Sequence, residues 1–333
     1  MTFQLLSPSV KKVDQNLVFM IYYYYTINFT GDIMEKISSL FMTIIVLFTT
    51  AFSSLFGIPF SHTYNVGINE KYTTINQALN EWKKDGYPKA TVNIANGRYN
   101  EKIFVDSGHE ISFIGESRDG VIITTHTGNY EDAPIFVRHG DVTIKNMTVI
   151  ADHSKNKNFS YYGNSSSTRA YAIHIDGGKI PGKVVVENVT AISYQSPAFG
   201  LGLIPGSTIR IENCDSISYT DKTYKNVPVG MALTYGSLLC HKSSESLYPE
   251  RKKEKLELVD VNVYSKNTEN ALYLLSEANE DFNLLAKNIT LKSGVSENGE
   301  GKFVFNNKKS ESKLKLDIRS RNNSNETLNY NKG

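Results

Sequence analysis

Short runs with apolar residues at the first, third and sixth positions, and mostly polar residues between them, recur through the chain after residue 110. Five of these runs also carry Asn or Asp at the fifth position. They are Val142–Val149, Val184–Ala191, Ile209–Ser216, Leu256–Val263 and Leu284–Leu291. This alternation is typical of short β-strands with one buried face. The shared fifth residue indicates that the five strands are repeats of one unit.

A second series of apolar runs lies between the first, so two strand types alternate along the chain. The second series comprises Pro134–Arg138, Ala170–Ile175, Phe199–Ile204, Gly230–Thr234, Ala271–Leu275 and Lys302–Asn306. Gly, Asn and Ser separate the runs, and no helical pattern lies between them, which excludes βαβ units. With the polar insertions 152–169 and 241–255 removed, each coil has roughly 25 to 30 residues. The sequence therefore predicts an all-β fold, a single-stranded right-handed parallel β-helix.

The residues at the fifth position are Asn146, Asn188, Asn213, Asp260 and Asn288. In a solenoid they would stack at one turn, with side-chain amides spaced by roughly 4.8 Å. Three of the asparagines also open Asn-x-Thr sequons, which a glycosylation interpretation would treat as acceptors. We favour the structural role, a ladder along the solenoid.

A solenoid needs a cap over its first coil, because an open sheet edge invites aggregation. The segment Thr73–Trp82 places Ile75, Ala78, Leu79 and Trp82 on one helical face, and Gly86 and Pro88 follow it. A capping helix is therefore expected at about 73–83. After Ile318 the chain becomes rich in Asn and poor in apolar residues, which predicts a frayed tail.

The first 60 residues differ in kind from the rest of the chain. No charged residue occurs from Ile37 to Phe60, and Met34 and Lys36 lie just before this stretch. We interpret 1–33 as a misannotated extension, 34–61 as a signal peptide or a membrane anchor, and 62–333 as the β-helix domain. Either alternative places 62–333 outside the cytoplasm, secreted or at the cell surface, and a membrane is a partner only if the segment stays uncleaved.

Composition removes several function classes. The 333 residues carry a net charge of +2, which gives no electrostatic signature for nucleic acid. The two cysteines, Cys214 and Cys240, are too few for a disulfide framework or a cysteine zinc site, and they could be bonded or merely stacked in the core. No carboxylate cluster indicates bound calcium, so we expect no cofactor and no metal.

A series of motifs in the first part of the domain resembles the opening of the pectin methylesterases, which have the pectin-lyase-like β-helix. The motifs are Tyr72–Ala78, Thr91–Glu101 with Gly-x-Tyr-x-Glu, Ile111–Glu116 and Val121–Thr124. The likeness is specific over about 70–125 and becomes a general β-helix pattern up to about 320. It implies carbohydrate chemistry on an acidic, pectin-like polysaccharide bound along one face of the helix.

The resemblance implies two catalytic aspartates, glutamines for an oxyanion and an orienting arginine, and this chain departs from most of that set. Arg169 stands where the family has glutamine, and Ser196 replaces the first aspartate. Asp221 is a plausible equivalent of the second aspartate, whereas alignment by strands places Pro228 or Val229 there. Leu272–Leu275 lacks the family's Arg and Trp. Activity as a carboxylic ester hydrolase by the family's mechanism is therefore not expected.

Strand alternation suggests a different site. If Tyr171, Ile173 and Ile175 face inward, then His174 and Asp176 face outward, beside a floor made by Gly200 and Gly202. These two side chains could act as an acid/base pair or bind sugar hydroxyl groups. Four further residues are expected to line this cleft, and their arginines could hold the carboxylate of a uronate. Those residues are Arg138, His139, Arg169 and His241.

Three functions fit this pattern: a polysaccharide-active enzyme with altered site residues, a non-catalytic glycan-binding surface protein, and a structural solenoid in which the outward histidines have no role. Fold alone does not choose among them. The enzyme requires an essential carboxylate or histidine in the cleft, and the glycan-binding protein requires only aromatic and hydrogen-bonding groups. The structural solenoid requires no cleft.

Overall fold

The computed structural model describes twelve segments of the chain, all within one compact unit, Ser61–Gly333. The segments are 61–125, 133–152, 171–175, 182–194, 197–203, 206–219, 231–235, 255–267, 269–276, 282–307, 314–319 and 330–332. The elements are β1 (His62–Val66), α3 (Ile75–Lys84), β2 (Ala90–Ile94), β3 (Gly97–Asn100), β4 (Ile103–Gly115), β5 (Val121–Thr125), β6 (Ile135–Ala151), β7 (Ile173–Ile175), β8 (Lys183–Ser193), β9 (Phe199–Leu203), β10 (Thr208–Ser218), β11 (Met231–Tyr235), β12 (Lys255–Ser265), β13 (Asn270–Ser276), β14 (Phe282–Lys287), β15 (Thr290–Ser293), β16 (Lys302–Asn307), β17 (Leu314–Arg319) and β18 (Tyr330–Lys332).

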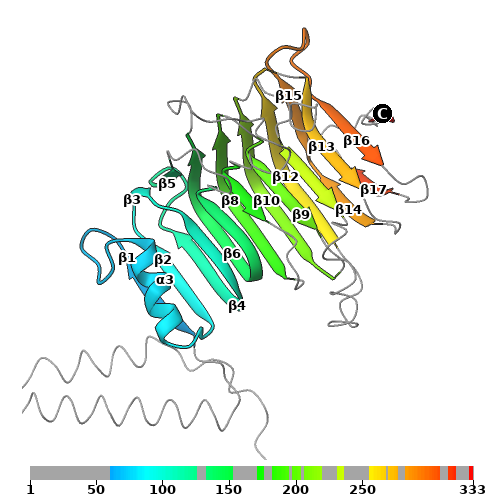
Figure 1. Ribbon diagram of the computed structural model, residues 1–333. Coiled ribbons are helices and arrows are strands. Elements are labelled where there is room, and N and C mark those ends of the chain that lie inside the picture. Colours follow the sequence, from blue (N-terminus) through cyan, green and yellow to red (C-terminus); the bar gives the residue numbers. More distant parts are fainter. Residues whose placement is uncertain are drawn as a thin grey trace, which may run out of the picture. The chain divides into compact units, whose positions relative to one another are not determined.

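These strands form a parallel β-helix, as the alternating runs predicted. The long strands β4, β6, β8, β10 and β12 pair in parallel, each with the next. The start of β6 also pairs with β7, and β7, β9, β11 and β13 continue that second row in parallel. Figure 1 shows the strands stacked one after another, starting from the end of the molecule that carries α3.

The ladder of fifth-position residues is confirmed. All five adopt left-handed backbone conformations, with φ between 52° and 56°. The amide of Asn188 donates to Oδ1 of Asn146 at 3.0 Å, and the amide of Asn213 donates to Oδ1 of Asn188 at 3.3 Å. Further along, the amide of Asn288 donates to Oδ1 of Asp260 at 2.9 Å. Asn and Asp tolerate this conformation better than other non-glycine residues, so the same residue type makes the bend and the ladder.

One coil earlier the column continues with a glycine. Gly115 is the last residue of β4 and belongs to the motif Ile111–Glu116. A Cβ built on it would lie 2.0 Å from the carbonyl oxygen of Asn146. Only a residue without a side chain fits there.

The interior is filled by apolar side chains that stack from coil to coil. Ile111, Val142, Val184, Ile209 and Leu256 are in register and no more than 4% exposed. Such columns follow from strand alternation, since every second residue faces the same side.

Cys214 also lies in the core, opposite Val261, as a free thiol. Burial raises its pKa to about 12. The bonded alternative for the two cysteines involved Cys240, which lies outside the described residues.

The capping helix is confirmed, with a start two residues later than expected. Thr74 is its N-cap and forms a capping box with Gln77, so helical geometry begins at Ile75. The face that packs on the first coil is the one the sequence indicated: Ile75, Ala78, Leu79 and Trp82 are all buried.

The motifs that carry the family resemblance serve this end of the fold. Glu101, the last residue of Gly-x-Tyr-x-Glu, accepts hydrogen bonds from the backbone N–H groups of Ile75 and Asn76, both at 2.9 Å. A carboxylate at a helix N-terminus stabilises the helix. The Tyr99 hydroxyl donates to the carbonyl of Ala95 at 2.7 Å. Glu101 thus holds the cap on the first coil, and Tyr99 bonds to the turn at Ala95, so these two residues indicate the fold rather than an activity.

The expectation of a frayed tail after Ile318 is wrong for its last described residues. Tyr330, Asn331 and Lys332 form β18 and pair in parallel with Phe303–Phe305 of β16. A strand edge presents unpaired backbone groups, and these residues satisfy part of that edge.

The ladder gives a first prediction. Asn188→Ala removes both amide contacts and places Ala in a left-handed conformation, so the free energy of unfolding should fall by about 2 to 3 kcal/mol. Asn188→Gly loses the same contacts without the backbone penalty and should cost about 1 kcal/mol less than Ala. Urea unfolding followed by circular dichroism measures both. Equal losses in the two variants would mean that the conformation contributes nothing.

Candidate functional site

The outer face of the second strand row carries a line of aromatic side chains. Phe104 of β4, Phe136 of β6 and His174 of β7 occupy equivalent positions in register, and Gly200 of β9 follows them. Their neighbours along each strand are core residues, such as Ile135 and Val137. Alternation therefore turns this row outward, as the sequence indicated.

His174 faces outward but is not exposed. Its ring stacks on Phe136, with centroids 4.5 Å apart and an interplanar angle of 7°, and it contacts the ring of Tyr171 at 5.0 Å. Only 4% of the residue is accessible. The expectation of an accessible histidine is wrong, because strand alternation gives direction and not exposure. The arrangement favours a packing role over proton exchange with a ligand.

Gly200 does not provide an open floor. A Cβ built on Gly200 would lie 2.3 Å from two ring carbons of Tyr171, so that ring covers the glycine. Tyr171 was expected to face inward with Ile173 and Ile175. It lies instead against the outer side of β9, because the missing side chain of Gly200 leaves room for a ring there.

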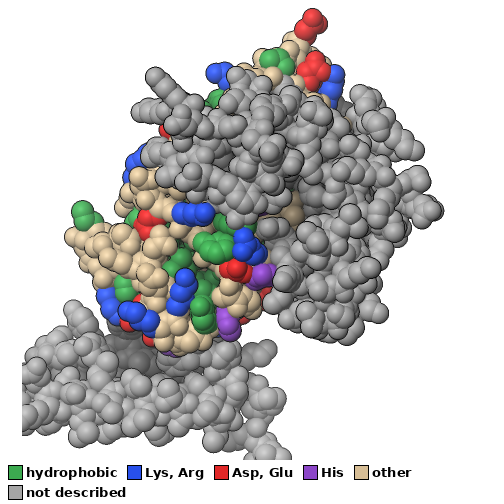
Figure 2. Space-filling model, in the orientation of Figure 1, with side chains coloured by type: hydrophobic (Ala, Val, Ile, Leu, Met, Phe, Trp, Pro, Cys, Tyr) green, Lys and Arg blue, Asp and Glu red, His purple; other side chains and the backbone are tan. Residues whose placement is uncertain are grey.

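A charged cluster lies at the corner that follows the aromatic row. Oδ2 of Asp106 lies 3.4 Å from Nη1 of Arg138, and Oδ1 of Asp106 contacts Nδ1 of His139. The Arg138 guanidinium also lies over the rings of Phe104 and Phe136, 5.3 and 5.2 Å from their centroids. Cations favour this position over aromatic faces. Figure 2 shows hydrophobic, Lys/Arg, Asp/Glu and His side chains next to one another in the region of β4 and β6.

A shift in strand register brings these groups together. Val105 pairs with Val137, but the next residue, Asp106, pairs with His139, so Arg138 is an extra residue in β6. Such a bulge redirects a side chain, and bulges are frequent beside functional sites. Sequence reasoning found Arg138 and His139 but missed Asp106. The alternation of Ile103 and Val105 with Phe104 and Asp106 was the signal that could have found it.

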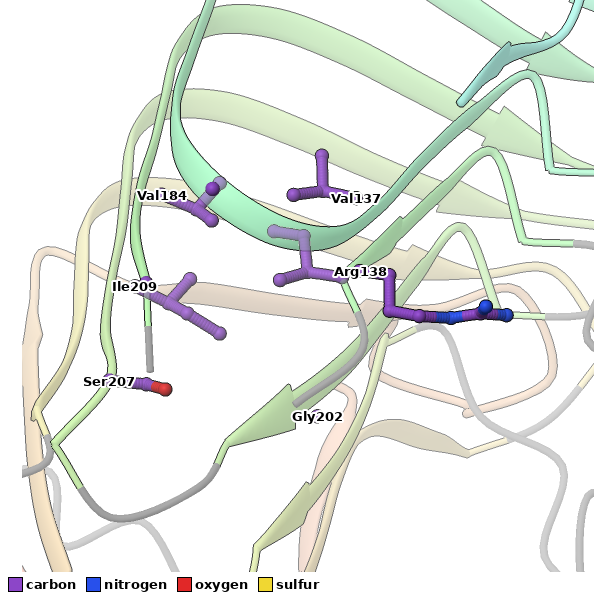
Figure 3. A pocket seen from close by; sticks show the side chains of 9 residues that line it. Val137, Arg138, Val184, Gly202, Ser207 and Ile209 are labelled. Atoms are coloured by element: carbon purple, nitrogen blue, oxygen red, sulfur yellow. The ribbon is translucent and has the colours of Figure 1, made fainter. Parts of the chain in front are cut away.

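Gly202 lies in a different place, in a small pocket between the coils. Its cavity volume is about 10 Å³, hardly room for one water molecule. Its walls are mostly core side chains such as Val137, Val184 and Ile209, and Figure 3 shows the side chain of Arg138 extending away from them. Ligand pockets usually have 300 to 1,000 Å³ and several polar groups. This pocket reads as a packing gap at the corner rather than a sugar site.

The other expected site residues fall outside the described residues. They are Asp176, Asp221, Arg169 and His241. Ser196, the residue at the place of the family's first aspartate, is also outside them.

Within the described residues, no group of three or more His, Cys, Asp or Glu side chains could hold a metal ion. No helix among the same residues is long and apolar enough to span a membrane.

Comparisons with known proteins found likeness only at the level of structure. No protein-family model and no curated protein matches the chain. Pectin methylesterase PemA from Erwinia chrysanthemi is 12% identical, with a TM-score of 0.40, over 78% of this chain and 81% of that one. The enzyme from Aspergillus niger is 14% identical, with a TM-score of 0.46, over 81% and 89% of the two chains. The enzyme from Yersinia enterocolitica is 14% identical, with a TM-score of 0.36, over 75% and 82%.

The chain is thus similar to several pectin methylesterases of the β-helix class. The identities and TM-scores are low, so this similarity concerns the fold and not the activity.

The packing of Tyr171 on Gly200 gives a second prediction. Gly200→Ala should lower the free energy of unfolding by about 2 kcal/mol, because the new methyl group overlaps the Tyr171 ring. The same substitution in a Tyr171→Ala background should cost much less, since the ring is gone. Urea unfolding of the four proteins gives the coupling free energy. Equal costs in the two backgrounds would show that the ring does not lie there.

Proposed function

We propose that the chain is a secreted glycan-binding protein, which holds an acidic polysaccharide against the outer face of β4 and β6. The observation that carries the proposal is Arg138, a cation laid over two phenylalanine rings beside Asp106 and His139. Export is supported by the uncharged stretch 37–60 of the sequence.

The chemistry of a uronate sugar fits this surface. About a third of the Arg138 side chain is exposed, and Phe104 is 38% exposed, so both remain accessible to a ligand. The apolar C–H groups of a sugar ring can pack on an aromatic ring, while the carboxylate takes a charge-assisted hydrogen bond from the guanidinium. A β-helix repeats its surface at each coil, which suits a linear polymer.

Binding is favoured over catalysis. The imidazole of His174 is enclosed between Phe136 and Tyr171, so it is poorly placed to exchange protons with a substrate. The sequence also has Ser196 where the resemblance places one of the two catalytic carboxylates. A carbohydrate-active enzyme remains the second candidate, supported by Asp221 alone.

Arg138→Ala tests the proposal. Affinity for a uronate hexamer should fall about tenfold, which is about 1.4 kcal/mol, while affinity for its carboxyl-reduced neutral counterpart should change less. Arg98→Ala is the control, because Arg98 is an exposed arginine on β3, which pairs with β5. Isothermal titration calorimetry on the full-length chain measures all three proteins. Absence of any acidic glycan binding, or an equal loss in the control, would contradict the proposal.

A further prediction separates binding from hydrolysis. The full-length chain should release little or no methanol from methyl-esterified pectin, because Ser196 replaces one of the two catalytic aspartates and Leu272–Leu275 lacks the orienting arginine. Methanol release is measured with an alcohol oxidase assay. Sustained turnover that Asp221→Ala abolishes would instead support the enzyme.

A further inference from the structure

We propose that Asp106 sets the charge selectivity of the Arg138 site. It acts as an internal counter-ion to Arg138, and its negative charge repels the carboxylate of a bound ligand. The inference rests on the proposed function and concerns how strongly the site prefers acidic ligands. Asp106 then becomes a specificity-determining residue, a role that the sequence did not suggest.

The bulge in β6 is the structural basis. Because Arg138 is an extra residue in β6, Asp106 of β4 faces both Arg138 and His139. One carboxylate oxygen is directed to the guanidinium and the other to the imidazole. About 30% of the Asp106 side chain is exposed, so its charge is only partly screened by water.

The negative charge of Asp106 lies beside the positive charge of Arg138. It therefore opposes the attraction of this guanidinium for an anion. A ligand carboxylate that binds Arg138 directly lies about 5 Å from the Asp106 carboxylate, given hydrogen-bond lengths on both sides of the guanidinium. At an effective dielectric constant between those of protein surface and water, this repulsion weakens binding roughly three- to tenfold.

Asp106 also orders the side chains around it, and this effect can be separated from its repulsion of a ligand carboxylate. Its oxygens fix the orientation of Arg138 and His139, which helps a ligand by preorganisation. Asparagine keeps an oxygen that accepts a hydrogen bond and removes the charge. Alanine removes both the charge and the acceptor. The counter-ion role therefore predicts that Asn strengthens acidic binding more than Ala does.

Calorimetry on the full-length chain with a uronate hexamer and its carboxyl-reduced form tests this inference. Asp106→Asn should bind the uronate hexamer roughly three- to tenfold more tightly, with the neutral form unchanged. Glu110→Gln is the matched control, because Glu110 is an acidic residue on the same strand, paired with Lys89 at 2.6 Å. It changes the net charge equally and should leave both affinities unchanged. In an Arg138→Ala background the gain from Asp106→Asn should disappear, because no ligand carboxylate is then held close to Asp106.

The outcomes distinguish this inference from the proposed function. If neither the unmodified chain nor Asp106→Asn binds the uronate hexamer, the proposed function fails and the inference with it. If the unmodified chain binds and Asp106→Asn does not bind more tightly, or if Glu110→Gln gives the same gain, only the inference fails. Should Asp106→Asn not fold, Asp106→Ser removes the same charge and carries the same expectation.

Discussion

The left-handed backbone at one corner of each coil is the constraint on which the rest of the structure depends. It fixes where each long strand bends, because Asn146, Asn188, Asn213, Asp260 and Asn288 all adopt it. A bend at the same position in successive coils keeps the strands on both sides in register. Apolar core side chains therefore stack on apolar side chains of the next coil. The loops between coils can then differ in length without disturbing the interior.

The fold was predictable from the sequence because its signals are local and repeated. Alternation gave the strand faces, the fifth-position Asn gave the corner, and the periodicity of Ile75, Ala78, Leu79 and Trp82 gave the cap. The site was less predictable, because it depends on contacts between coils. The burial of His174 comes from the rings of Phe136 and Tyr171, and the role of Asp106 comes from a one-residue bulge that no spacing in the sequence reveals.

The outer face combines a row of packed aromatic rings with a cluster of charged side chains. Aromatic rings in register contact one another along the outside of the solenoid. The bulge beside them turns a cation and an imidazole toward one carboxylate. Packing thus supplies the rigid support on which a ligand site depends. Among the motifs that resemble the pectin methylesterases, Glu101 has a structural role, because it accepts hydrogen bonds from the first turn of α3.

The asparagine ladder also has a consequence for how the protein can be produced. Asn146, Asn188 and Asn288 each open an Asn-x-Thr sequon, and in the folded chain the amides of Asn188 and Asn288 donate within the ladder while Asn146 accepts there. An oligosaccharide attached to one of these nitrogens before folding would occupy the space of the neighbouring coil. In a eukaryotic secretory pathway, N-glycosylation would therefore compete with folding at these three positions. In a host without N-glycosylation this competition would not occur.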